Sequence, residues 1–589
     1  MQNPLVWKLI DIEQRPESPC AFKFKKDKVW VEKTWKDFKT DVRKMASLLK
    51  DFNVQTGDRV AILANSRYEW TVVDFAGQSI GAVIVPVYQS SKYDELEYIL
   101  NHSEAKVLFL DNLKQYKKWE KARPQCKTVE RVMSFDEIKI HPETSIQKAS
   151  ESSSLMSEKE FIESIKKRTL DENATIIYTS GTTGLPKGVL FTHTQITFEA
   201  EKTYGIMPVS PEDSSLCFLP FAHVLGRLES WAHVLVGFTL VYAETIEKVA
   251  DNIKEIKPTI LMSVPRIYEK IYGKLEELMG QKSVTKKFFE WGKKCAKIKA
   301  DSIQNINTPT TLQSIELKLF DLGFAKLVRG VLGGRLKFAI SGGAPLSKEL
   351  AEFFLGCGVT VLEGYGLTET TGALFFNHPD NLKLGTVGLP IEGADIKIAA
   401  DGEILAKSKN VMKEYYKDPE ATAAAMVDGY FATGDIGNID EDGFLTITDR
   451  KKDLIKTAGG KYVAPQKLEN LIKLHPLVSN VLIHGDRKKY VVALVTVEKA
   501  AVKNFSERNG EDTKQAINSP DQSGIVVESI KVHMRKVNRD LASYETVKKY
   551  KILSNDFTIE SGELTPSLKV KRKFCDKKYE LEINSLYDS

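Results

Sequence analysis

The segment Tyr178-Thr-Ser-Gly-Thr-Thr-Gly-Leu-Pro-Lys-Gly-Val189 is the most informative part of this 589-residue chain. Apolar residues 174–178 predict a short buried strand that leads into small hydroxyl and glycine residues. Such small side chains let backbone N–H groups approach an anion, while the hydroxyls add hydrogen-bond donors and Lys187 adds a positive charge. The segment therefore predicts a loop that binds a polyphosphate; an ordinary surface loop is the simpler alternative.

This loop differs from the Walker A loop of P-loop NTPases. A Walker A lysine follows a glycine and precedes Ser or Thr, whereas Pro186 and Gly188 flank Lys187 here. The segment instead resembles the phosphate loop of AMP-forming acyl-CoA synthetases, the adenylate-forming superfamily that includes luciferases and the adenylation domains of peptide synthetases. The resemblance implies that ATP contacts Thr179, Ser180, Gly181, Thr182, Thr183, Gly184 and Lys187.

Composition indicates an ordinary globular protein of two or three domains. Hydrophobic residues make up 42% and charged residues 28% of the chain, and 84 basic against 79 acidic residues give a net charge of +5. That small excess is not typical of a nucleic-acid binder, so we expect no nucleic-acid partner. Six dispersed cysteines without a CxxC pair favour neither a disulfide framework nor a structural zinc site.

The apolar segments are too short to predict membrane insertion. The first residues, MQNPLVWKLI, lack the basic and apolar regions of a signal peptide. No window reaches the roughly 18 consecutive apolar residues that a spanning helix requires. We therefore expect a cytoplasmic protein that at most rests on the inner face of a membrane.

Residues 35–110 alternate between helical and strand patterns. Apolar residues are spaced for an amphipathic helix over 35–52, and continuous apolar runs at 59–63, 81–85 and 107–110 predict strands covered on both faces. Alternation of strands and helices predicts layered α/β sheets. The Ser-, Lys- and Glu-rich residues 138–164 are expected to form a surface excursion.

Two further predicted strands end in residues suited to ligand binding. The strand over 336–340 leads into Ser341-Gly-Gly-Ala-Pro-Leu346, and the strand over 359–363 leads into Gly364-Tyr-Gly-Leu-Thr-Glu-Thr370. Ligands bind open α/β sheets at the carboxyl ends of strands. Tyr365 offers a flat face to a base, Thr368 a hydroxyl to a phosphate, and Glu369 an oxygen ligand to Mg²⁺. The resemblance implies the same roles, puts Gly342 at the acyl pocket, and adds to the nucleotide site Gly343, Ala344, Gly364 and Gly366.

The strand-like run from Leu216 ends on His223. A lone histidine in apolar company is more often a packed residue than a functional one. The resemblance places Phe221 and His223 beside the acyl pocket, without an acid–base role.

Short segments with turn signals fill residues 386–448 and predict a small antiparallel, β-barrel-like subdomain. The span 428–452 closely resembles the signature of fatty-acyl-CoA synthetases. That resemblance implies that Asp435 accepts hydrogen bonds from the ribose hydroxyls, that Arg450 joins the nucleotide site, and that Lys452 is a hinge. It divides the chain into an N-terminal adenylation domain, 1–450, and a mobile C-terminal domain, 451–589.

The residues after the hinge are typical of a small α+β unit. A helix over 465–474, with proline in its first turn, precedes a strand over 491–497. The resemblance makes Lys569, in Thr565-Pro-Ser-Leu-Lys-Val-Lys-Arg-Lys573, the adenylation lysine, catalytic together with Thr368 and Glu369. It places on the coenzyme A side Lys456, Gly459 and Gly460. A solvated basic tail is the simpler interpretation of the lysine-rich segment.

A long helical insertion over 264–335 bears on substrate class. It resembles the long-chain branch of the synthetases, since short-chain and aryl members join the flanking blocks more directly. Residues 286–299 hold six lysines against one glutamate, which indicates either a solvated face or a contact with anionic lipid.

The resemblance extends over roughly residues 30–575 and implies a long-chain fatty acid–CoA ligase. Its substrates are a fatty acid, ATP and coenzyme A, and Mg²⁺ is its cofactor. The fatty carboxylate first attacks the α-phosphate to give acyl-AMP, and the coenzyme A thiol then displaces AMP. The alternatives are a fatty acyl-AMP ligase that loads a carrier protein, an aryl or luciferase-like member, and an inactive nucleotide-binding homologue.

Overall fold

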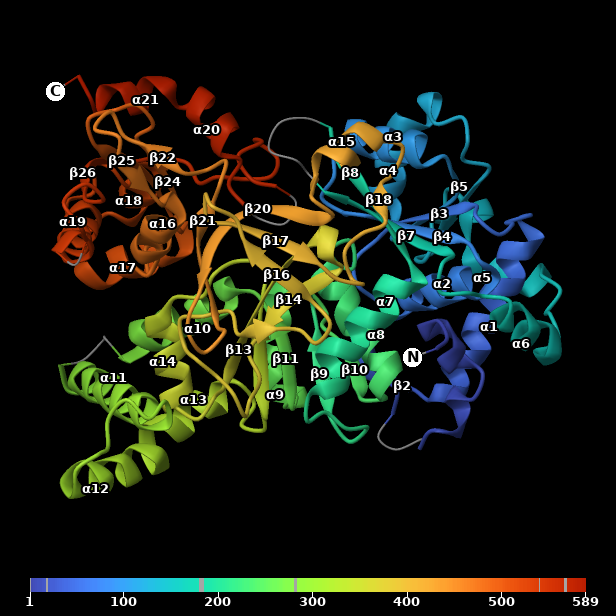
Figure 1. Cartoon of the computed structure of the whole chain (residues 1–589), viewed down its shortest axis with the longest axis horizontal. Helices are drawn as coiled ribbons and strands as arrows, with labels where there is room; N and C mark the ends of the chain where they lie inside the picture. The colour runs from blue at the N-terminus through green and yellow to red at the C-terminus, as the bar shows by residue number, and fades with distance from the viewer. Residues whose placement is uncertain are drawn as a thin grey trace.

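The computed structural model describes residues 2–16, 20–179, 185–279, 283–539, 541–565 and 569–588 (Figure 1). They form a mixed α/β protein with a large N-terminal part and a smaller C-terminal part. Two large sheets and one small antiparallel sheet make up the N-terminal part. Among the residues that the structure describes, no helix is both long and apolar enough to cross a membrane.

The first large sheet has seven strands and is parallel through its centre. Its order is β18 (Glu414–Tyr415), β8 (Lys187–Thr192), β7 (Asn173–Thr179), β4 (Val83–Val87), β3 (Arg59–Leu63), β5 (Ala105–Leu110) and β6 (Arg131–Ser134). Alternate residues of the central strands enter two separate cores. One core lies against α1 (Trp35–Asp51) and α2 (Tyr68–Ile80), and the other lies against α3 (Tyr93–Ser103) and α4 (Leu113–Ala122). Burial on both faces explains why these strands are continuous apolar runs.

The second large sheet has nine strands. Its order is β15 (Leu389–Pro390), β14 (Gly372–Phe376), β13 (Val361–Leu367), β12 (Phe338–Ser341), β11 (Ile260–Ser263), β9 (Ser214–Cys217), β10 (Thr239–Tyr242), β1 (Phe22–Lys26) and β2 (Val29–Lys33). The pairs from β1 through β10, β9, β11 and β12 to β13 are parallel, and the edge pairs are antiparallel. The segments 341–346 and 364–370 therefore leave neighbouring strands at the same edge.

The third sheet has five antiparallel strands and lies in the centre of Figure 1. It consists of β16 (Asp395–Ile398), β17 (Glu403–Lys407), β19 (Met426–Val427), β20 (Tyr430–Ile439) and β21 (Leu445–Arg450). One of the turns predicted within 386–448 is the β16–β17 hairpin, where Gly402 has a φ of +87°.

The C-terminal part is built on a three-stranded sheet with cores on both faces. The strands are β24 (Val478–His484), β25 (Val491–Val497) and β26 (Val547–Ile552), and a hairpin of β22 (Ile455–Lys456) and β23 (Tyr462–Val463) precedes them. One core includes residues of α16 (Pro465–Lys473) and α19 (Gly524–Arg539), and the other includes residues of α20 (Arg572–Lys578) and α21 (Glu580–Ser585).

The helices connect and cover these sheets. In the N-terminal part they are α1 (Trp35–Asp51), α2 (Tyr68–Ile80), α3 (Tyr93–Ser103), α4 (Leu113–Ala122), α5 (Ile146–Ser152), α6 (Glu158–Lys166), α7 (His193–Thr203), α8 (Val224–Val236), α9 (Val249–Ile256), α10 (Pro265–Met279), α11 (Ser283–Ile303), α12 (Thr311–Phe320), α13 (Lys326–Val331), α14 (Lys348–Gly356) and α15 (Pro419–Ala424). In the C-terminal part they are α16 (Pro465–Lys473), α17 (Lys499–Asn509), α18 (Thr513–Asn518), α19 (Gly524–Arg539), α20 (Arg572–Lys578) and α21 (Glu580–Ser585).

The structure differs from the sequence-based expectation in four places. The strand predicted over 359–363 is β13 at Val361–Leu367, so the segment 364–370 begins inside a strand. The strand predicted at 81–85 is β4 at Val83–Val87, because Gly81, with a φ of +86°, ends α2. The residues predicted as a surface excursion, 138–164, are mostly exposed, but they form α5 and most of α6, and Phe161 is fully buried. The strand expected to run to His223 ends at Cys217.

Candidate functional site

The phosphate side of the site begins at the β7–β8 hairpin. Thr179 and Lys187 are paired residues in the antiparallel register of these two strands. The predicted contacts between them, Ser180, Gly181, Thr182, Thr183 and Gly184, lie outside the described residues. The Lys187 ammonium lies 4.7 Å from the centroid of the Tyr415 ring, an arrangement that attracts a cation to the ring face.

Tyr415 connects this hairpin to Glu369. Its hydroxyl donates a hydrogen bond to Glu369 Oε1 at 2.8 Å. Burial raises the pKa of Tyr415 above its ordinary value, so the hydroxyl keeps its proton and remains a donor at neutral pH. The structure thus places Lys187 over the ring and Glu369 at the hydroxyl of the same tyrosine.

The Glu369 carboxylate suits a metal ion that is held mainly by a substrate. Glu369 is half-buried, and within the described part of the chain its Oε2 has no hydrogen-bond partner. No group of three or more His, Cys, Asp or Glu side chains in that part is arranged to hold a metal. Mg²⁺ is commonly held by one or two carboxylates together with substrate phosphates, so these residues fit it.

A buried carboxyl group supports the Glu369 turn from behind. Glu199 of α7 accepts hydrogen bonds from the Ala373 backbone N–H at 2.6 Å and from Asn410 Nδ2 at 2.8 Å. The Asn410 side chain also donates to the Ala373 backbone carbonyl at 2.9 Å. The Asn410 backbone carbonyl accepts from the Thr371 hydroxyl at 2.7 Å. Burial raises the pKa of Glu199 to about 8.

The backbone of this turn tolerates little change. Gly372 has a φ of +146°, and a Cβ atom there would lie 2.4 Å from Glu199 Oε1. Thr371 adopts a left-handed φ of +58°, which is uncommon for a residue other than glycine. The Met412 N–H donates to the Glu369 carbonyl at 2.7 Å. The turn that presents Thr368 and Glu369 is therefore held from two sides.

The opposite wall of the site consists of Tyr365, Asp435 and Arg450. Asp435 accepts a hydrogen bond from the Tyr365 hydroxyl at 2.8 Å and from Arg450 Nε at 3.1 Å. Antiparallel pairing places Asp435 opposite Arg450 on β20 and β21. Burial raises the pKa of Asp435, against the opposing effect of Arg450. A carboxylate in this position can accept hydrogen bonds from sugar hydroxyls.

Three of the glycines at the ends of β12 and β13, namely Gly342, Gly364 and Gly366, are packed closely. The Gly342 N–H donates to the Ser263 carbonyl at 3.2 Å, and a Cβ on Gly342 would contact Leu225 at 3.4 Å. Gly343, with a φ of +78°, and Ala344 are exposed. A Cβ on Gly366 would lie 1.6 Å from the Gly372 carbonyl oxygen, and one on Gly364 would lie 2.9 Å from Phe376 Cδ2.

Phe221 and His223 have different environments. Phe221 is fully buried and packs against Trp70, with ring centroids 5.0 Å apart. His223 is half-buried and caps α8, because its Nδ1 accepts from the Leu225 N–H at 3.1 Å. Burial, and to a smaller extent the charge of Lys569, lowers the pKa of His223 to about 4. The imidazole is therefore neutral at pH 7.

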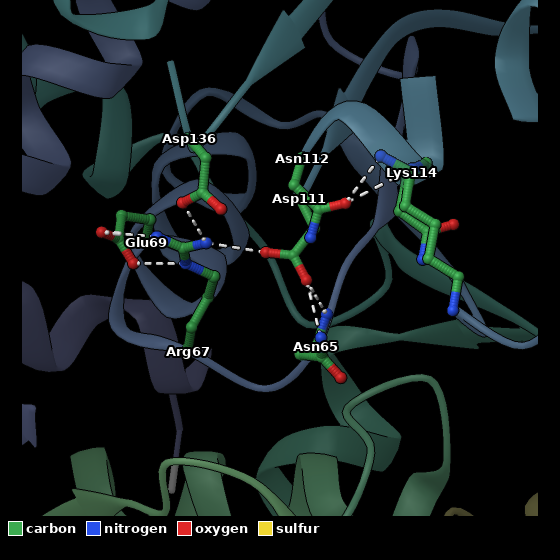
Figure 2. Close-up of polar contacts among 8 residues, drawn as sticks. Asn65, Arg67, Glu69, Asp111, Asn112, Lys114 and Asp136 are labelled. Atoms are coloured by element: carbon green, nitrogen blue, oxygen red, sulfur yellow. Dashed lines mark hydrogen bonds and ion pairs between the residues drawn. The ribbon is translucent and has the colours of Figure 1, made fainter. Parts of the chain in front are cut away.

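The loop after β3 holds this segment in place. The Ser66 hydroxyl donates to the Leu219 carbonyl at 2.7 Å and accepts from the Phe221 N–H at 3.0 Å. Beside Ser66, Arg67 donates to Asp111 at 2.7 Å, and Figure 2 shows its guanidinium among three carboxylates. The other two are Glu69 and Asp136, and Asn65 donates to the second oxygen of Asp111. The network joins the carboxyl ends of β3 and β5.

Lys569 reaches the site from the C-terminal part of the chain. The residue as a whole is exposed, but its ammonium group lies within electrostatic range of Arg450, Asp435 and Glu369. Desolvation, followed by the charge of Arg450, lowers the pKa of Lys569 to about 8. The Lys569 backbone is fixed by Thr565, which donates its N–H to the Lys569 carbonyl at 2.8 Å and accepts from the Lys569 N–H at 3.0 Å.

The C-terminal part docks on α10 in this arrangement. Glu277 of α10 accepts hydrogen bonds from Asn504 at 3.3 Å and from Arg508, both on α17. Arg266 lies 3.9 Å from Glu498. Lys452 lies in an exposed turn in which the Asp453 and Leu454 N–H groups donate to the Arg450 carbonyl.

The residues predicted for the coenzyme A side lie elsewhere. Lys456 ends β22, and Gly459 and Gly460 form the turn before β23. All three are exposed, and the Lys456 carbonyl accepts from the Arg487 N–H at 2.8 Å. The structure does not bring them to the groups around Lys569.

Three residues of the site were not singled out from the sequence. Tyr415 is the second residue of the two-residue strand β18. Glu199 and Asn410 form a hydrogen bond although they are 211 residues apart in the sequence. No local pattern distinguishes Glu199, because the buried face of α7 also contains His193, Thr197 and Thr203.

The comparisons with known proteins agree with this geometry. The AMP-binding enzyme family matches residues 11–416, and the C-terminal domain of AMP-binding enzymes matches residues 452–589. The chain belongs to the AMP-binding enzyme family. The resemblance of the phosphate loop is thereby confirmed.

Named relatives and solved structures extend this result. The chain is 34% identical over 571 residues to the long-chain-fatty-acid–CoA ligase FadD15 of Mycobacterium tuberculosis, covering 95% of this chain and 93% of that protein. It is 30% identical over 585 residues to fatty acyl-CoA synthetase A of Dictyostelium discoideum, covering 92% and 84%. The crystal structure of the anthranilate CoA ligase AuaEII with anthranoyl-AMP matches with a TM-score of 0.74 at 19% identity, covering 99% and 98%. This last likeness shows the shared fold.

Proposed function

We propose that this protein is a long-chain fatty acid–CoA ligase that activates its substrate through an acyl-AMP intermediate. The observation that carries the proposal is the convergence of Glu369, Asp435, Arg450 and Lys569 from three separate segments around one space. The similarity to a relative named long-chain-fatty-acid–CoA ligase supports the choice of substrate.

In the first step a fatty carboxylate oxygen attacks the α-phosphorus of ATP. An O–P bond forms, the bond to the β-phosphate oxygen breaks, and pyrophosphate leaves. Lys187, Thr179 and Thr368 hold phosphate oxygens, and the Lys569 ammonium stabilises the charge that develops at the α-phosphate. Asp435 orients the ribose, and Mg²⁺ bound at Glu369 would supply further charge neutralisation.

In the second step the coenzyme A sulfur attacks the acyl carbon. A C–S bond forms, the C–O bond to AMP breaks, and the thiol proton passes to solvent. Lys569 must leave the acyl carbonyl for the thiol to approach. The C-terminal domain, which we place at 451–589, turns about Lys452 and brings toward the site Lys456, Gly459 and Gly460.

The alternatives have less support. Loading of a carrier protein is no better supported than transfer to coenzyme A. An inactive nucleotide-binding homologue does not need four charged groups held together. Gathering charged side chains in one place costs free energy of folding, and such clusters are typical of functional sites.

Two finer statements belong to the same proposal. The protein acts in the cytoplasm, and it makes peripheral contact with the inner face of an anionic membrane. The lysines of α11 support that contact, and the arrangement of the neighbouring helices sharpens it below.

Substrate length tests the proposed activity. Burying each CH₂ group contributes about 0.8 kcal/mol, so kcat/KM should rise along the series from acetate to chains of about twelve carbons or more. The measurement is AMP release with coenzyme A present, together with thioester formation. A maximum at acetate or butyrate would refute the long-chain assignment, and acyl-AMP that transfers only to a carrier protein would refute the acceptor.

Glu199→Gln should weaken adenylation about tenfold, because a glutamine oxygen accepts from one donor while its NH₂ group cannot accept from the other. If Glu199 positions the Glu369 turn, the Mg²⁺ concentration needed for half-maximal pyrophosphate release should rise as well. Transfer from supplied acyl-AMP to coenzyme A should be unchanged.

Lys202→Ala is the matched control on the same helix, since Lys202 pairs with Glu392 at the surface. Equal loss of both half-reactions, or a lower melting temperature without a shift in Mg²⁺ requirement, would show that Glu199 acts only in folding.

A further inference from the structure

An apolar stripe runs along the exposed face of α12 and into the π-helical turn that follows it, Asp321–Ala325. Leu312, Ile315, Leu319 and Leu322 follow one another at three- and four-residue intervals and are 80%, 55%, 63% and 75% exposed. This spacing places them on one side of a helix. Scattered exposed leucines are ordinary, but a continuous apolar face marks an interaction surface.

The stripe is held outward by the packing of the opposite face. Phe320 is fully buried, with its ring centroid 6.1 Å from that of Trp291 on α11. The Trp291 indole donates to Glu316 at 2.6 Å, and Thr310 begins α12 with a capping box. The helix is therefore anchored to α11, and Figure 1 shows α11 and α12 projecting at the lower left, away from the sheets.

Lysines flank the apolar stripe, and only some of them form ion pairs. Of the lysines predicted to form a basic face, Lys293 pairs with Glu290, Lys297 with Glu352, and Lys299 with Asp321. Five other lysines are exposed and have no ion pair within the described ranges, three on α11 and two beside the stripe: Lys286, Lys287, Lys294, Lys318 and Lys326. Half of the expected basic face is thus neutralised, and Lys318 on α12 and Lys326 at the start of α13 place positive charge beside the apolar stripe.

We infer that the α12 stripe inserts into the surface of an anionic lipid bilayer, with these five lysines over the headgroups. An apolar face flanked by lysines is the pattern of a helix that lies in the membrane interface. Attraction between lysines and anionic lipid adds to the apolar contact. A second copy of this chain fits less well, because a symmetric contact through the stripe would bring the same lysines together.

This surface is linked closely to the site. α11 crosses α14 so tightly that a Cβ on Gly356 would lie 2.0 Å from the Ala296 carbonyl oxygen. α14 begins at Lys348, two residues after the Ser341–Leu346 segment that contains Gly342, Gly343 and Ala344. The inference rests on the proposed function in one respect: contact with the bilayer places the enzyme at the membrane in which its proposed substrate, a long-chain fatty acid, is dissolved.

Vesicle co-sedimentation of the full-length protein tests the inference. The parent should bind vesicles that contain phosphatidylglycerol more strongly than vesicles of phosphatidylcholine alone, and added salt should weaken the binding. Leu312→Ser/Leu319→Ser should lower partition into the anionic vesicles about tenfold or more. Lys318→Glu/Lys326→Glu should lower it in the anionic vesicles only. The matched control is Val29→Ser/Leu581→Ser, which removes two exposed apolar side chains elsewhere and should bind like the parent.

Activity with detergent-dispersed fatty acid separates this inference from the proposed function. The stripe variant should keep the parental kcat/KM in detergent and lose activity only toward fatty acid presented in vesicles. Parental vesicle binding by the stripe variant, or no lipid binding by an active parent, would overturn the inference and leave the ligase proposal standing. A concentration-dependent dimer of the parent that the stripe variant abolishes would also overturn it, in favour of contact between two copies. Vesicle binding by a protein without ligase activity would refute the proposed function instead.

Discussion

Lys569→Ala is expected to lose adenylation by a factor of about 10²–10³ while converting supplied acyl-AMP and coenzyme A to acyl-CoA at nearly the parental rate. Removal of one preorganised charge-stabilising donor has an effect of this size on a step that develops negative charge. The Lys569 ammonium is the cation that the C-terminal part contributes beside Asp435 and Glu369. Pyrophosphate release and thioester formation, measured separately, give the two rates.

The pH profile gives a second readout for the same residue. The pKa of Lys569 is lowered to about 8, so its charge is present below that pH and is lost as the pH rises through it. kcat/KM for adenylation, which reports the free enzyme, should therefore fall above pH 8. Lys569→Arg keeps its charge over this range and should remove the fall. If Lys569→Ala slows both half-reactions equally, Lys569 acts in docking or folding rather than in adenylation.

Local patterns predicted the parts of the site that lie at strand ends. The strand predicted over 174–178 is found as β7, and the segment 341–346 follows β12 as predicted, because buried strands and small residues leave a clear local signal. The segment 364–370 follows the parallel part of β13, but its first four residues continue that strand. The continuous apolar run Val491–Val497 was likewise predicted as a strand and is found as β25.

Long-range pairing was not predictable from one sequence. Glu199 and Asn410 each look like ordinary polar residues until the fold brings them together. The lysines of α11 resembled one solvated face, yet Lys297 and Lys299 pair with carboxylates 55 and 22 residues away. The burial of α6 was missed because Phe161 and Ile165, one helical turn apart, are surrounded by Ser, Lys and Glu.

The docked C-terminal part explains why the structure displays one half of the proposed cycle. Its contacts with α10 through Glu277 hold Lys569 over the nucleotide side, while Lys456, Gly459 and Gly460 stay exposed in the β22–β23 hairpin. If the thiol approaches from the side that the ammonium occupies, the two steps require two arrangements. The proposed turn about Lys452 would supply the second.

A tether across this contact should therefore separate the two half-reactions in the opposite sense to Lys569→Ala. Glu277→Cys/Arg508→Cys places thiols on α10 and α17 where the native side chains meet. After cross-linking with a thiol reagent that contains a reducible disulfide, adenylation should continue at nearly the parental rate. Thioester formation should fall by about 10² or more, because small displacements of reacting groups already cost that much. Reduction of the linker should restore it.

Two controls make the outcome specific. Lys503→Cys/Glu507→Cys carries the same linker within α17, where the native side chains lie 3.9 Å apart, and should leave both rates unchanged. Parent protein treated with the reagent reports on the native cysteines, five of which are buried while Cys20 is half-buried. A tethered enzyme that forms acyl-CoA at the untethered rate would show that both steps occur in the docked arrangement. In that case Lys569 would have to share the acyl carbonyl with the incoming thiol, and no turn about Lys452 would be needed.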